Sequence, residues 1–100
     1  MAVAIVNTDF PEGVGADTYD AVNAEMGVED SPPEGLIFHW AGEIYGKWAI
    51  TDVWESREAY ERFSDERLQP AIQKVAAAAG IEAGGQPTTH EYPVHNFIKP

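Results

Sequence analysis

The stretch Trp48–Phe63 changes its hydrophobic period from two to about 3.6 residues at Glu55–Ser56. After this point Ser56 is a suitable N-cap, and Ala59, Tyr60 and Phe63 recur at helical spacing. Before it, alternate residues share one face of a pleated strand, namely Trp48, Ile50, Asp52 and Trp54. The sequence therefore predicts a strand that runs directly into a helix, and it predicts a carboxylate on an otherwise apolar strand face.

Hydrophobic spacing and turn residues define the remaining elements. Gly27 follows the first helical pattern as a C′ residue, Pro70 kinks or divides the second helix, and Pro93 places the last strand at an edge or beside a bulge. The predicted strands are Ala2–Asn7, Gly35–Gly42, Lys47–Trp54 and Thr88–Ile98; the helices are Asp17–Met26 and the segment from Ser56 to Ala79; Glu43–Gly46 is a hairpin turn and Gly84–Gly85 a connection.

The order strand, helix, strand, strand, helix, strand is typical of an α+β fold, the ferredoxin-like βαββαβ sandwich. In that fold both helices cover one face of an antiparallel sheet. The other face would carry apolar side chains and stay uncovered in a monomer, and a chain of 100 residues buries only a modest fraction of its surface. We therefore expect residues 1–100 to form one domain that pairs face to face with a second copy, as a dimeric α/β barrel.

Composition excludes several functional classes. The chain has no cysteine, so disulfides, thiolate catalysis and Cys-ligated metal sites are ruled out. Six basic against 17 acidic residues give a net charge of −11, and no base precedes Lys47. Such a surface repels nucleic acid and anionic membranes. The N-terminus lacks a basic n-region and no apolar run is long enough to span a bilayer, so a cytoplasmic protein is expected.

Asp52 and His39 are the first candidates for chemistry. The predicted face of Asp52 is otherwise Trp and Ile, where a carboxylate must be paired, hydrated or useful. His39 shares its strand face with Ile37 and Ala41, and an imidazole in such surroundings is suited to be a general base. The alternative is a packing histidine satisfied by one hydrogen bond.

His90 and Tyr92 share a face of the last predicted strand, and an imidazole beside a phenol suits proton removal with stabilisation of an enolate. Isolated residues of this kind near a C-terminal edge are more often surface groups. His39, His90 and His95 together with Glu91 or Asp52 would be metal-ligand types, but strand parity separates His90 from His95. No metal site and no cofactor are therefore predicted.

Aromatic side chains could stack on a planar ligand. The alternative is that most of them form the core or a dimer interface. The residues proposed to contact substrate are Trp48, Trp54, Tyr60 and Phe63.

Three segments resemble the dimeric α/β-barrel superfamily, and in particular small proteins similar to antibiotic-biosynthesis monooxygenases. They are Gly35–His39, Asp52–Ser56 with Glu58, Ala59 and Phe63, and Tyr92–Phe97. The resemblance implies a homodimer with a ligand pocket between sheet and helices in each subunit. The superfamily includes cofactor-free oxygenases of polyketide quinols, cyclases, lactone isomerases and haem enzymes. The Trp, Asn and Tyr of the oxygenases have no assigned counterparts, although Trp48, Trp54, Asn96, Tyr45 and Tyr92 offer these residue types.

Two functions from different classes remain open. One is a cofactor-independent oxygenase or cyclase that acts on an aromatic or polyketide-like small molecule, with His39 and either Asp52 or Tyr92 transferring protons. The other is a non-catalytic dimer that binds a small hydrophobic molecule or acts as an interaction module. Convergent polar groups in a pocket would favour the enzyme, and a fully packed interface between helices and sheet would favour the module.

Overall fold

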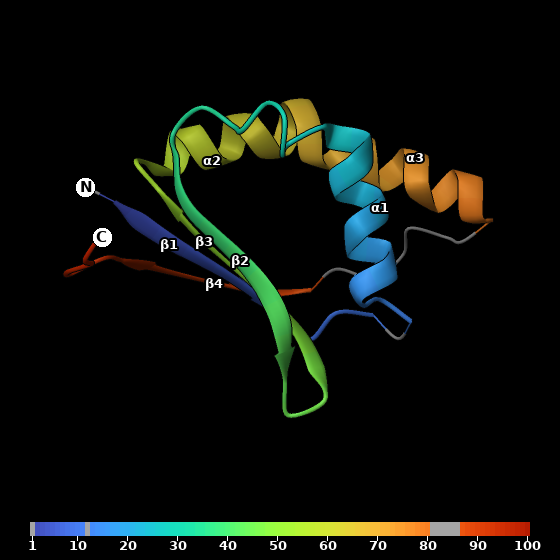
Figure 1. The fold of residues 1–100 in the computed structure, drawn as a ribbon, viewed down its shortest axis with the longest axis horizontal. Coiled ribbons are helices and arrows are strands. Elements are labelled where there is room, and N and C mark those ends of the chain that lie inside the picture. The colour runs from blue at the N-terminus through green and yellow to red at the C-terminus, as the bar shows by residue number, and fades with distance from the viewer. Residues whose placement is uncertain (1, 12, 81–86) are drawn as a thin grey trace.

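The computed structural model describes residues 2–11, 13–80 and 87–100. A four-stranded antiparallel sheet has the order β2-β3-β1-β4, and the helices lie on one side of it (Figure 1). The predicted α+β ferredoxin-like fold is thereby confirmed. The elements are β1 Val3–Thr8, α1 Ala16–Met26, β2 Leu36–Ile44, β3 Lys47–Trp54, α2 Arg57–Phe63, a π-helical segment η1 Ser64–Leu68, α3 Gln69–Ala79 and β4 Thr88–Pro93.

The junction between β3 and α2 follows the predicted change of period. Strand β3 ends at Trp54, and Ser56 caps α2 by accepting a hydrogen bond at Oγ from Ala59 N, at 3.2 Å. Gly35 directly precedes β2, has a φ of +88° and closely approaches Ala59. The carbonyl of Gly35 also accepts a hydrogen bond from Glu55 N at 2.8 Å, which ties the start of β2 to the end of β3.

Two strand ends differ from the sequence prediction by more than one residue, namely those of β2 and β4. The hairpin is tighter than expected, because β2 continues to Ile44 and only Tyr45 and Gly46, both at positive φ, form the turn. The second helix divides as expected near Pro70, which lacks an N–H, and a π-helical turn precedes it. Strand β4 stops at Pro93 rather than Ile98. The connection predicted at Gly84–Gly85 lies outside the described residues.

Register assigns each strand residue to a face of the sheet, because directly opposed residues in antiparallel strands point the same way. One row faces the helices: His39, Asp52, Ile5 and Glu91. The next row faces away: Trp40, Thr51, Val6 and His90.

The core lies between the β1–β3 pair and α2. Trp54 and Ile5 are each 1% exposed, and Val3 completes the buried cluster. Leu36, Ala59, Tyr60 and Phe63 pack around this cluster. Neither α1 nor α2 contains a fully buried residue, but Tyr60 and Phe63 of α2 belong to the shell of this cluster. Among the described residues, every helix is too short or too polar to cross a lipid bilayer.

Candidate functional site

A chain of hydrogen bonds connects the core to helix α1. Asp52, buried on β3, places Oδ1 2.5 Å from His39 Nδ1 on β2, and its Oδ2 accepts a hydrogen bond from Trp54 Nε1 at 3.3 Å. The other imidazole nitrogen, Nε2, is hydrogen-bonded to the Tyr19 hydroxyl of α1. The helix α1 and the neighbouring strands β2 and β3 therefore supply one connected polar network.

The direction of these bonds follows from the donor inventory. A carboxylate only accepts, so Asp52 holds the proton of a neutral His39 on Nδ1. The lone pair of the ring is then on Nε2, where the Tyr19 hydroxyl donates to it. A base oriented by a carboxylate on one nitrogen and facing a hydroxyl with the other is the arrangement that general-base catalysis uses.

Burial decreases along the network. The side chain of Asp52 is 10% exposed and that of His39 is 32% exposed. Asp52 is thus fixed by the core, whereas the imidazole is open to a small molecule from solvent. The site combines a rigid acceptor with an accessible base.

Tyr19 is held as a neutral phenol. Burial raises its pKa above the usual 10.0, and the negative charges of Asp52, Asp20 and Glu29 raise it further, against a hydrogen bond with Asn23 that lowers it. Its ring is nearly parallel to the His39 ring, at 4° with centroids 5.8 Å apart, and 5.5 Å from the Trp48 ring. Tyr19 lies within the helix predicted over Asp17–Met26, but it is not among the candidate site residues predicted from the sequence. The missed signal is the hydroxyl, which on an inward helix face needs a partner.

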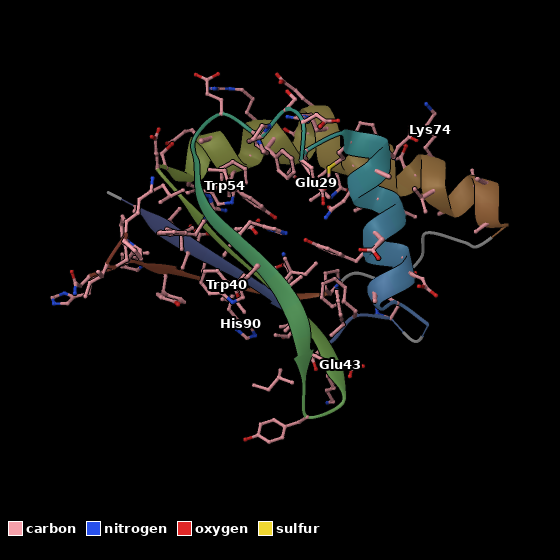
Figure 2. The ribbon with its side chains drawn as sticks, viewed as in Figure 1. Glu29, Trp40, Glu43, Trp54, Lys74 and His90 are labelled. Carbon is pink, nitrogen blue, oxygen red and sulfur yellow. The ribbon has the colours of Figure 1, made fainter. Side chains whose placement is uncertain are left out.

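The structure does not bring His90 and Tyr92 to this network. They pair with Val6 and Ala4 and so point to the opposite face of the sheet. Figure 2 shows His90, like Trp40, on the side of the sheet away from α2, while Trp54 lies between the sheet and that helix. His90 Nε2 instead lies 3.4 Å from Thr8 Oγ1. Alternation along β4 explains the separation, because Glu91 is the residue in the row of His39.

The four aromatic residues predicted to contact substrate divide into two groups. Trp54 packs against Tyr60 and Phe63, with ring centroids 5.8 and 5.2 Å apart. These three belong to the core cluster or its shell. Trp48 instead lines an open hollow of about 360 Å³ together with Phe10, Pro11, Val14 and Lys47, among others. Trp48 is therefore the member of the set that borders open space.

Within the part of the chain that the structure describes, no three His, Asp or Glu side chains gather as metal ligands. His39 and His90 lie on opposite faces of the sheet. The remaining histidine, His95, follows the end of β4.

No protein-family model matches the chain, and no curated protein matches it. Several solved structures, in contrast, match the chain. SnoaB, a cofactor-independent oxygenase from Streptomyces nogalater, is 16% identical with a TM-score of 0.64, over 99% of this chain and 98% of that one. Rv0793 from Mycobacterium tuberculosis is 14% identical with a TM-score of 0.67, over 99% and 100%. A putative antibiotic biosynthesis monooxygenase from Chloroflexus aurantiacus is 19% identical with a TM-score of 0.58, over 98% of each chain.

At these identities the likeness shows the fold alone. The chain has the ferredoxin-like fold of the antibiotic-biosynthesis-monooxygenase-like proteins, and the resemblance predicted from Gly35–His39, Asp52–Ser56 and Tyr92–Phe97 is confirmed at that level. Fold does not select a reaction, so function has to be argued from the network around His39.

Proposed function

We propose that this protein is an enzyme that removes a proton from an acidic phenol or enol of an aromatic or polyketide-like small molecule, with His39 as the general base. The observation that carries the proposal is the position of His39 between a buried carboxylate and a phenol. Asp52 fixes the tautomer and orientation of the imidazole, and Nε2 already binds a hydroxyl group of the class that the substrate would present.

The phenol of Tyr19 is a stand-in for substrate rather than a proton relay. Its raised pKa favours the protonated phenol, which donates a hydrogen bond to Nε2. A more acidic phenol at the same place transfers its proton to His39 more readily. On this account substrate displaces the Tyr19 hydroxyl, and the proton passes from the substrate oxygen to Nε2.

Deprotonation leaves an electron-rich phenolate or enolate. Such an anion can attack a carbonyl carbon of the same molecule, which is cyclisation, or donate an electron to molecular oxygen as the first step of oxygenation. Neither reaction requires a cofactor. The fold shared with SnoaB, described as a cofactor-independent oxygenase, supports this class of chemistry for the present chain.

We also propose that the protein acts as a homodimer. Three large side chains on the sheet face away from the helices are exposed: Trp40 at 55%, Ile44 at 58% and Tyr92 at 52%. Phe97 from the C-terminal segment packs edge-on against Phe38 and covers part of this face. A second copy of the chain would cover the rest, as the dimeric α/β barrel predicted from the sequence requires.

Turnover of quinols tests the catalytic proposal. Oxygen uptake and product formation with an anthrone or quinol substrate should fall by about 10² to 10⁴ in His39→Gln. His95→Gln is the matched control, because His95 is exposed beyond the end of β4. Equal rates for the two variants and the natural protein would remove His39 as the base. Binding of quinols without turnover by the natural protein would favour the non-catalytic binding module.

A further inference from the structure

Two tryptophans on the helix-facing side of β3 differ in how their indole N–H groups are used. Trp54 Nε1 donates to Asp52 Oδ2 at 3.3 Å. Trp48 Nε1 is buried and has no hydrogen-bond partner among the residues that the structure describes. A buried indole N–H normally finds an acceptor, and leaving one unpaired typically costs about 1 to 3 kcal/mol. Binding an acceptor from outside the described residues would therefore remove this cost.

Trp48 is connected to the candidate base through Tyr19. Its ring is 5.5 Å from the ring of Tyr19, the same residue whose hydroxyl binds His39 Nε2. Tyr19 belongs to α1 and lies outside the core cluster of Val3, Ile5 and Trp54. When Tyr19 turns away from His39, the contact between Tyr19 and Trp48 is released as well.

We propose that the Trp48 indole N–H binds an oxygen acceptor of the ligand whose hydroxyl group is bound at His39. This inference rests on the proposed function of His39 and adds a specificity-determining residue to it. Because an indole N–H only donates, the ligand group must be an acceptor. The substrate class is therefore a planar molecule that carries both an acidic hydroxyl and a second oxygen acceptor.

Charge favours a neutral acceptor over a carboxylate. The chain carries a net charge of −11, and the carboxylates of Asp52, Asp20 and Glu29 all act on Tyr19 in the same region. Their field repels an anionic ligand group. A carbonyl oxygen accepts the indole hydrogen bond without that penalty, so the expected ligands are hydroxy-carbonyl aromatics.

Binding of two probes of similar shape tests the inference. We would compare a hydroxyanthraquinone, which has carbonyl acceptors, with the corresponding hydroxyanthracene, which lacks them. Trp48→Phe keeps an aromatic ring but removes the donor together with part of the indole. It should weaken the hydroxyanthraquinone by about tenfold more than the hydroxyanthracene, because both probes lose the same ring contact and differ by one hydrogen bond. Tyr45→Phe, in the exposed turn between β2 and β3, is the control and should change neither affinity.

The stability of the free protein provides a second readout. The smaller ring costs stability, but no hydrogen bond is lost, so Trp48→Phe should lower the melting temperature less than Trp54→Phe, whose indole N–H donates to Asp52. Equal weakening of both probes, or full retention of hydroxyanthraquinone binding, would overturn the inference. Probe binding tests the recognition of a carbonyl by Trp48, whereas turnover of His39→Gln tests the role of His39 as the base. Failure of one proposal is therefore distinguishable from failure of the other.

Discussion

The imidazole of His39 and the carboxylate of Asp52 face each other across the neighbouring strands β2 and β3, with 2.5 Å between Nδ1 and Oδ1. The second carboxylate oxygen accepts from Trp54, which is 1% exposed and packs in the core. The same carboxylate therefore connects the core to the accessible base. This link makes the orientation of His39 depend on the packing of the domain.

Replacing Asp52 by Asn should destabilise the protein by about 1 to 3 kcal/mol. His39 Nδ1 and Trp54 Nε1 both donate to the carboxylate, and an amide has only one oxygen to accept them. Its NH₂ group would face the other donor. Urea unfolding of the variant measures the loss. Asp30→Asn is the control, because Asp30 is exposed and should change stability by no more than about 0.5 kcal/mol. Equal, small losses would mean that Asp52 is not a paired carboxylate.

Tyr19→Phe should tighten phenol binding without lowering the catalytic rate. The variant keeps the ring beside Trp48 and removes the hydroxyl that competes for His39 Nε2. We expect KM for a phenolic substrate to fall by about three- to tenfold, since one modest hydrogen bond no longer has to be broken. Steady-state kinetics separates the two roles of Tyr19. A fall in kcat at unchanged KM would identify Tyr19 as a proton relay and contradict the displacement account.

A charge on the open sheet face should separate the proposed dimer. Trp40→Asp places a carboxylate on the side of the sheet away from the helices, where a second copy would bury it without a partner. Sedimentation at micromolar concentration should give twice 10.9 kDa for the natural chain and a single copy for the variant. Gln73→Glu, exposed in α3, is the control and should remain dimeric. A natural chain that sediments as a monomer would remove the barrel assembly.

The sequence contained most of the fold because its local signals agree with one another. Alternation in Lys47–Trp54, the cap at Ser56 and the glycine at Gly27 each predict an element boundary that the structure has. The end of β4 was harder to predict, because the alternating pattern runs on beyond Pro93 while the ladder of paired residues ends there.

The candidate site was predictable only in part. Parity placed His39 and Asp52 on inward faces, yet their pairing depends on the register between β2 and β3. The bulge between Leu36 and Phe38 shifts that register, and no local pattern reveals it. Tyr19 joins through packing of α1 over the sheet edge, which is a long-range contact.

Stability should fall at alkaline pH because of Tyr60. Burial raises the pKa of its phenol above the usual 10.0, and the charge of Asp52 adds to this against a hydrogen bond from Asn7. The unfolded chain then loses the phenolic proton at lower pH than the folded protein. The contribution of Tyr60 is therefore complete below pH 10.0 and is lost as the pH rises through the raised value.

Urea unfolding between about pH 9 and pH 11.5 measures this dependence. Tyr60→Phe should have a shallower decline than the natural chain, because it lacks the titrating group. Parallel declines for the two proteins would show that the phenol of Tyr60 ionises alike in the folded and unfolded states.

The most direct test of the account is nitrogen NMR of the His39 ring with and without a phenolic ligand. In the free protein, Nδ1 should carry the proton that is hydrogen-bonded to Asp52, and Nε2 should be hydrogen-bonded to Tyr19. Addition of a hydroxyanthraquinone should shift the Nε2 resonance of His39 and leave His90 and His95 unchanged. An imidazole at His39 that shows the tautomer mixture of a solvent-exposed histidine and ignores the ligand would contradict the assignment of His39 as the base.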